Sequence, residues 1–162
     1  MIEVFVVLII IGILAAMAAP SFQSTIERNR LKEALVAIQG GLFLAHSEAI
    51  KQGTTLYFNS TAGNDGAWCY SVNLSACDCS ETDSTSADYC PTGTTAVGRA
   101  NRIRTLQGAN YATIDLLTTT SIEFEPLRGV KQAGAASIGV RSTNFSSSIS
   151  ISDAGLISTS DF

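Results

Sequence analysis

This sequence lacks the residues that several common chemistries require. Its 162 residues hold 10 Lys and Arg against 14 Asp and Glu, and a net charge of −4 gives no general attraction for a phosphate backbone. His46 is the only histidine, which leaves no Ser/His/Asp triad with an alternative base. The chain also has no phosphate-binding glycine loop. We therefore expect no enzyme and no cofactor.

Charge is also missing from the first part of the chain. After Glu3 come sixteen uncharged, almost wholly apolar residues, 4–19, and Pro20 ends the run. As a helix this segment would extend about 24 Å, somewhat short of the ~30 Å hydrocarbon core of a bilayer. It therefore predicts a marginal membrane span. Because neither a basic leader nor a small-residue cleavage site is visible, we expect the segment to remain in the mature protein.

Glu3 lies where a bilayer would begin. Burying a carboxylate there costs on the order of 2.5–3.5 kcal/mol. One explanation is that the charge stays hydrated at the interface. The other is a cation in another copy of the chain, because an ion pair about 4 Å long at an effective dielectric near 20 recovers roughly 4 kcal/mol. The second explanation predicts a homo-oligomer.

The pattern becomes amphipathic after Pro20. We predict one helix of about fifty residues that ends near Gln52, where Gly53 supplies a stop. Apolar residues at spacings near 3.6 predict a single packed face on it. These residues are Phe22, Ile26, Leu31, Ala34, Leu35, Ile38, Leu42, Ala45 and Ala49.

Short β-like runs follow the helix, and their alternation favours half-buried antiparallel strands that cover its apolar face. The predicted strands are 54–58, 68–72, 102–106, 113–116, 121–124, 136–140 and 148–151. We therefore expect an α+β protein in three parts. Residues 1–20 form a hydrophobic helix half, 21–53 an amphipathic half, and 54–162 a β-rich head.

The first twenty residues resemble those of a known family. Glu3, the apolar stretch after it, the run Gly12-Ile13-Leu14-Ala15-Ala16 and Pro20 closely resemble the N-terminal helix of type IV pilins and pseudopilins. Mature chains of that family read approximately F-T-L-I-E, then an apolar stretch, G-I-L-A-A and a proline. Since the glutamate is the fifth mature residue there, the resemblance implies that the numbered chain begins two residues after a processed, N-methylated phenylalanine.

The resemblance also implies a fold and roles for three residues. The type IV pilin fold packs a long N-terminal α-helix against an antiparallel β-sheet. Glu3 would neutralise the N-terminal amine of an adjacent subunit during assembly. Gly12 and Pro20 bracket the stretch most easily unwound, which predicts a kink, or a non-helical segment at 14–19 if the chain is in a filament. The chain would wait in the bacterial inner membrane before pilus or secretion machinery assembles it into an extracellular filament.

Later segments look like the GspH/FimT branch of that family. Residues 45–53, 122–129 and 149–155 are similar to stretches that often read A-R-S-E-A-I-x-R-G, F-x-P-x-G and I-x-I-S-x-x-G-R. We interpret the chain as a structural subunit of a type IV pilus-like filament. The alternative is a minor pilin or pseudopilin of a type IV pilus or a type II secretion system.

A third hypothesis is DNA uptake, because some FimT-like members bind DNA through a G-R-x-R element. The matching positions here are Gly155-Leu156-Ile157-Ser158, without either arginine. The hypothesis therefore rests on the one basic cluster, Arg99, Arg102 and Arg104, for which ordinary surface or inter-subunit contacts are the simpler explanation. We expect DNA not to be a partner.

Four cysteines fall in the loop-rich stretch 69–90: Cys69, Cys77, Cys79 and Cys90. Their spacing lacks the C-x2-C pairs of zinc sites, and an exported head lies in an oxidising compartment, so we predict two disulfides that stiffen this loop. A Cys77–Cys79 bond is least favourable because its ring is so short. Of the other two connectivities, we favour Cys69–Cys77 with Cys79–Cys90 over the crossed alternative.

Two further groups of polar residues suggest ligands or modifications. Four carboxylates fit no EF-hand spacing, so we expect them to solvate the loop rather than hold calcium; they are Asp78, Glu81, Asp83 and Asp88. We expect no metal. Three asparagines begin N-x-S/T sequons and are candidate glycosylation sites, although such short motifs also arise by chance; they are Asn59, Asn73 and Asn144.

Overall fold

A computed structural model describes residues 2–91, 104–127, 129–130 and 136–160, and shows the predicted α+β fold. The helix α1 (Ile2–Gln52) comes first, and a short 3-10 helix η1 (Gly108–Asn110) interrupts the strands that follow. The strands are β1 (Leu56–Thr61), β2 (Cys69–Asn73), β3 (Arg104–Gln107), β4 (Asp115–Leu116), β5 (Thr120–Glu125), β6 (Gly129–Val130), β7 (Ala136–Arg141), β8 (Ser146–Ile151) and β9 (Ile157–Thr159).

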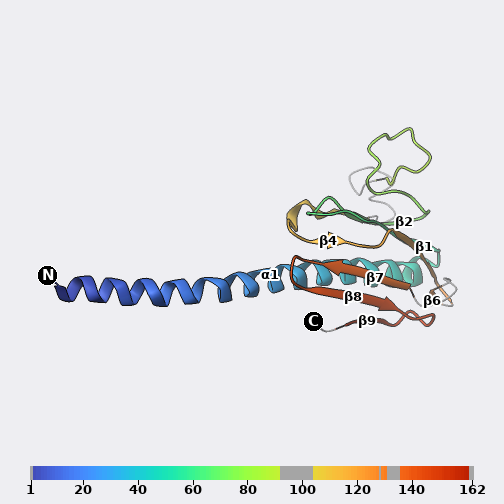
Figure 1. The fold of residues 1–162 in the computed structure, drawn as a ribbon. Coiled ribbons are helices and arrows are strands. Elements are labelled where there is room, and N and C mark those ends of the chain that lie inside the picture. The colour runs from blue at the N-terminus through green and yellow to red at the C-terminus, as the bar shows by residue number, and fades with distance from the viewer. Residues whose placement is uncertain (1, 92–103, 128, 131–135, 161–162) are drawn as a thin grey trace.

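The helix α1 is uninterrupted through Gly12 and Pro20 (Figure 1). Residues 14–19, for which we expected a non-helical state in a filament, are helical in this single chain. The helix ends at Gln52 as predicted. Gly53 follows with φ of +63°, a left-handed conformation that glycine adopts without steric cost, and its N–H donates to the Ile50 carbonyl at 3.4 Å.

The strands form two antiparallel sheets where we expected one. The order β3-β2-β1-β5-β6 defines the first sheet, and β4-β7-β8-β9 defines the second. An isolated bridge connects Leu116 of β4 to Gly63, two residues after the end of β1. Figure 1 shows the second half of α1 lying along this pair of sheets while its first half projects as a rod. The strands β6 and β9 lie outside every predicted run.

The packed face of α1 is confirmed only inside the head. Its buried residues are at most 5 % exposed: Leu31, Ala34, Leu35, Ile38, Leu42, Ala45 and Ala49. They share one core with residues of both sheets. Phe22 and Ile26, predicted on the same face, are 69 % and 52 % exposed. That part of the prediction is wrong, because these two residues lie on the stretch of helix that precedes the buried one.

Two adjacent glycines in α1 have opposite surroundings. A Cβ on Gly41 would lie 2.5 Å from the ring of Tyr70. That ring is fixed, since its hydroxyl donates to the Ala37 carbonyl at 2.9 Å and it stacks on Phe58 with ring centroids 5.2 Å apart. A Cβ on Gly40 would meet nothing within 4 Å. The head therefore requires glycine at position 41, whereas no neighbour described in this chain requires it at position 40.

This contrast makes a matched pair of variants. We expect Gly41→Ala to lower the free energy of unfolding by about 1–3 kcal/mol through overpacking. Gly40→Ala should raise it by up to about 1 kcal/mol, because alanine is the better helix former. Urea unfolding followed by the fluorescence of Trp68, the single tryptophan and 2 % exposed, measures both. Equal stability of the two variants would contradict the packing described for Tyr70.

Candidate functional site

The first half of α1 exposes a continuous run of large apolar side chains. Every large apolar side chain from Ile2 to Leu14 is at least 50 % exposed. Soluble monomers rarely leave so continuous an apolar surface in water, and such surfaces usually mark contacts with protein or lipid. The rod therefore has the character of an assembly surface.

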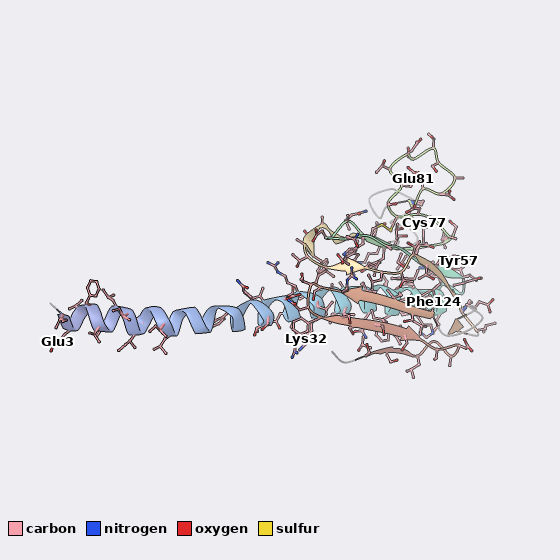
Figure 2. The ribbon with its side chains drawn as sticks, in the orientation of Figure 1. Glu3, Lys32, Tyr57, Cys77, Glu81 and Phe124 are labelled. Carbon is pink, nitrogen blue, oxygen red and sulfur yellow. A yellow bond between two sulfur atoms is a disulfide. The ribbon has the colours of Figure 1, made fainter. Side chains whose placement is uncertain are left out.

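Glu3 is placed at the outer end of this rod (Figure 2). Lys32, at the near edge of the head, is about 44 Å further along the helix at 1.5 Å per residue. In the described part of the head, therefore, no cation lies close enough to pair with Glu3. In the part of the chain that the structure describes, no helix combines the length and the apolarity needed to cross a membrane.

The four cysteines form two disulfides, as predicted, but the favoured pairing is wrong. The bonds are Cys69–Cys79 and Cys77–Cys90, which is the crossed connectivity. They lie at the base of a lobe that extends away from the first sheet, with Glu81 further out in the lobe than Cys77 (Figure 2).

The crossing follows from the path of the chain after β2. Cys69, Ser71 and Asn73 point to the same side of that strand, because alternate residues share a face. The chain then turns back, so that the Cys77 sulfur lies 3.6 Å from the Asn73 amide nitrogen and 3.5 Å from the Ser71 hydroxyl. Two residues later, Cys79 reaches Cys69 at the start of the strand. Cysteine spacing alone contains no information about this return.

The carboxylates of the lobe order its turns. Asp78 accepts hydrogen bonds from the Ser80 hydroxyl at 2.7 Å, the Ser80 N–H at 2.9 Å and the Thr61 hydroxyl at 2.8 Å. The bonds from Ser80 are the main reason why the pKa of Asp78 lies below its ordinary value. Asp83 accepts from the N–H and hydroxyl of Thr85, which lower its pKa in the same way.

Glu81 and Asp88, the other two acidic residues that we expected to solvate this loop, contribute to the same turns. One carboxylate oxygen of Glu81 accepts from the backbone N–H groups of Thr82 and Asp83, both at 2.9 Å. The carbonyl of Asp88 accepts from the N–H of Asp78 at 2.7 Å. Among the described residues, no group of three or more His, Cys, Asp and Glu side chains is placed to hold a metal ion.

The hairpin between β7 and β8 contacts α1 just before its buried stretch. Asn144 donates its backbone N–H and its side-chain amide to the two carboxylate oxygens of Glu27, at 2.7 and 2.8 Å. Beside them, the Arg28 guanidinium lies 4.9 Å from the centre of the Phe145 ring, within range of a cation–π interaction. We call these four residues the collar. It fixes the helix against the head, and no sequence pattern revealed it.

The three sequons lie in different surroundings. Asn59 and Asn73 are 1 % and 2 % exposed, and each donates its amide to the Cys77 sulfur. Asn144 is exposed, but its amide donates to Glu27 in the collar. A glycan on any of the three would replace one of these contacts, and Asn144 alone has open space around it. Glycosylation stays a prediction.

The remaining candidates are His46 and the predicted basic cluster. His46 packs its ring against Phe124, with centroids 5.7 Å apart, and lies next to the backbone of Gly155. Arg104 is exposed at the start of β3. Arg99 and Arg102, the other members of the predicted basic cluster, fall outside the described residues.

A long helix with an exposed apolar half and a head of antiparallel strands defines a type IV pilin-like protein. A family model for the type II transport protein GspH matches residues 34–155, and the chain belongs to this family. The fold and the GspH/FimT branch predicted from the sequence are thereby confirmed.

Solved structures with the same fold include the type IV minor pilin FimU of Pseudomonas aeruginosa (strain PAO1). One crystal form has a TM-score of 0.58 and 17 % identity, over 83 % of this chain and 91 % of that chain. A second has a TM-score of 0.51 and 14 % identity, over 83 % and 92 %. A comparison with curated proteins finds no match.

Peptide mapping tests the crossed disulfides. Cleavage before aspartate in the unreduced, unfolded chain separates Cys77 from Cys79, because Asp78 lies between them. We expect one species in which peptide 65–77 is bonded to both 78–82 and 88–114. A free peptide 65–77 with an internal bond would instead show Cys69–Cys77, and fragment ions between those two cysteines identify the third connectivity.

Acid should loosen the collar. The Asn144 donors hold the pKa of Glu27 below its ordinary value of 4.5. Glu27 therefore contributes stability that is complete above its unfolded-state pKa and is lost as the pH falls through the lower folded-state pKa. We expect Glu27→Gln to lower the urea midpoint at pH 6, and we expect this effect to disappear as the pH falls below the folded-state pKa of Glu27.

Asn144→Ala provides the control for that experiment, because it removes one of the two donors to Glu27 and leaves the backbone donor in place. In this background Glu27→Gln should change the midpoint at pH 6 by less than it does in the wild type. An unchanged effect of Glu27→Gln would show that Glu27 acts through something other than the side-chain amide of Asn144.

Proposed function

We propose that this chain is a subunit of a type IV pilus-like filament and polymerises through the exposed half of α1. The observation that carries the proposal is the exposure of the apolar rod from Ile2 to Leu14. This rod is exposed on every side, although the later part of the same helix is packed inside the head. Sister rods that pack together would remove this surface from water, which is favourable by about 25 cal/mol per Å² of apolar area.

Glu3 has a defined role in this proposal. Once the rods pack together, its carboxylate lies at the edge of an apolar bundle, where an unpaired charge is costly. The N-terminal amine of an adjacent subunit supplies the opposite charge, as the family resemblance implies. The distance from Glu3 to the head supports an intermolecular partner.

The proposal includes a stage before assembly and a change on assembly. Before assembly, the uncharged residues 4–19 hold the chain in the inner membrane until pilus or secretion machinery extracts it. On assembly, the stretch bracketed by Gly12 and Pro20 unwinds, because a proline and a glycine both weaken the helix there. The filament is then extracellular.

A second candidate function is that of a minor pilin or pseudopilin. The matching family model is named for a type II transport protein, and the similar solved structures are of a minor pilin. The first name favours a subunit of a type II secretion filament, and the second favours a minor subunit of a type IV pilus. DNA uptake has the weakest support, since Arg104 is the one described member of its basic cluster.

Neutralising Glu3 tests the filament proposal. We expect Glu3→Ala to reach the membrane fraction but to be reduced at least tenfold in sheared filaments, because its charge no longer pairs during assembly. Glu81→Gln removes the same charge from the lobe and should assemble normally. Normal assembly of Glu3→Ala would overturn the role given to Glu3, and absence of the wild-type chain from filaments would overturn the function. The mass fraction of the chain in those filaments separates a major from a minor subunit.

A further inference from the structure

A row of four polar side chains crosses the first sheet on the side that faces the disulfides. The row consists of Ser121, Asn59, Ser71 and Thr105, which are paired across β5, β1, β2 and β3. Cross-strand partners share a face of a sheet, and Ser71 shares its face with Cys69. Asn59 and Ser71 are 1 % and 0 % exposed. Buried polar groups need partners, so the atoms to which this row donates indicate its role.

Two amides and a hydroxyl donate to the disulfide Cys77–Cys90. The amide nitrogens of Asn59 and Asn73 lie 3.3 and 3.6 Å from the Cys77 sulfur. The Ser71 hydroxyl lies 3.5 Å from the same sulfur and 3.1 Å from the Cys90 sulfur, so the two sulfurs share its one hydrogen. A disulfide sulfur is a weak acceptor. These buried donors are therefore directed at an atom that satisfies them poorly.

Neighbouring groups hold both amides in this orientation. The Ser121 hydroxyl donates to the Asn59 amide oxygen at 2.6 Å. The Leu74 N–H donates to the Asn73 amide oxygen at 2.8 Å. Because each oxygen is engaged, each nitrogen faces the Cys77 sulfur. The donors are thus in place before a better acceptor forms.

A thiolate at Cys77 would be that better acceptor. Hydrogen bonds to a charged group are roughly twice as strong as those between neutral groups, and donors around a charged form favour that form. The surroundings of Cys77 therefore stabilise the opened bond more than the closed one. The bond Cys69–Cys79 differs, because the Thr61 hydroxyl lies 3.5 Å from the Cys79 sulfur but gives its hydrogen to Asp78 at 2.8 Å.

The partner sulfur can be approached from a cavity. Cys90 lines a cavity of about 340 Å³ together with Cys79, Tyr89 and Thr105. In the ranges that the structure describes, the Thr105 hydroxyl is the one buried side-chain oxygen or nitrogen without a hydrogen-bond partner. A small dithiol in this cavity would lie beside Cys90, with Thr105 as a further donor.

We propose that Cys77–Cys90 is a site of thiol–disulfide exchange with external dithiols, in which Cys77 is the leaving group. A thiolate of the dithiol attacks the Cys90 sulfur and forms a mixed disulfide, and the electron pair of the broken bond stays on Cys77. The second thiolate of the dithiol then attacks the first sulfur and releases the Cys90 thiolate, which takes up a proton. The dithiol ends as a cyclic disulfide, oxidised by two electrons, and the cysteine pair is reduced by two.

Nearby carboxylates oppose the charge on Cys77. Asp78 and Asp88 line a cavity of about 410 Å³ with Cys77, and Glu81 lines the cavity beside Cys90. A negative charge close to a thiol disfavours its thiolate. The donors therefore act against these carboxylates, and their contribution is measured by removing a donor while every carboxylate stays in place.

Exchange at this bond would open the outer part of the lobe and keep its base. Residues 80–89 lie inside the ring that Cys77–Cys90 closes, whereas Cys69–Cys79 closes the ring next to β2. Reduction of the first bond alone would release the outer turns from this constraint. The two disulfides of the lobe would thus respond to different redox conditions.

Redox titration of the full chain in detergent tests the proposal. The chain is equilibrated with mixtures of reduced and oxidised dithiothreitol, alkylated with N-ethylmaleimide and cleaved before aspartate. Peptides 65–77, 78–82 and 88–114 then report each bond separately. We expect the equilibrium constant for reducing Cys77–Cys90 to exceed that for Cys69–Cys79 at least tenfold. Equal constants, or a larger one for Cys69–Cys79, would overturn the proposal.

Removing the shared hydroxyl tests the donors. We expect Ser71→Ala to make Cys77–Cys90 about fivefold harder to reduce, as for the loss of one hydrogen bond, whereas a general loss of stability would make both bonds easier to reduce. Ser147→Ala removes a buried hydroxyl that donates to the Ser160 carbonyl, and it should leave both constants unchanged. An unchanged or larger constant for Cys77–Cys90 in Ser71→Ala would contradict the role of the donors. If Ser71→Ala does not fold, Asn73→Leu replaces it, with the same expected and the same contradicting result.

Discussion

The packing of one helix stretch against two sheets is the constraint on which the rest of the structure depends. From Leu31 to Ala49, α1 supplies the residues that join both sheets into a single core. Gly41 allows Tyr70 to lie flat on the helix and bond to Ala37. This contact fixes the helix inside the head. The residues that precede Leu31 therefore extend beyond the head, and the apolar side chains among them stay exposed.

The collar and the disulfides extend that constraint in opposite directions along the molecule. The hairpin that carries Asn144 and Phe145 binds α1 just before the buried stretch, so the rod leaves the head in a defined direction. Away from the helix, the crossed disulfides attach the lobe to β2. The lobe needs these bonds because its residues are mostly polar and bury little apolar surface. Carboxylates such as Asp78 then order the turns between the bonds.

The sequence predicted the elements of this fold better than their contacts. Hydrophobic periodicity located α1 and the glycine that ends it, and alternation located most strands, because both patterns reflect local geometry. The two misplaced residues, Phe22 and Ile26, have the right spacing for the core but lie ahead of the head, and spacing does not show where a covering surface ends. Disulfide pairing and the collar depend on contacts between distant segments, which no local pattern records.

The crossed bonds also change what a single cut in the backbone can do. The ring closed by Cys69–Cys79 and the ring closed by Cys77–Cys90 overlap at residues 77–79. Wherever a surface protease nicks the chain between Cys69 and Cys90, at least one sulfur bridge still spans the nick. Bonds placed one after the other would leave the link at Asp78 unprotected. The lobe thus remains covalently attached to β2 after a single backbone cleavage that would release it if the disulfides were placed one after the other.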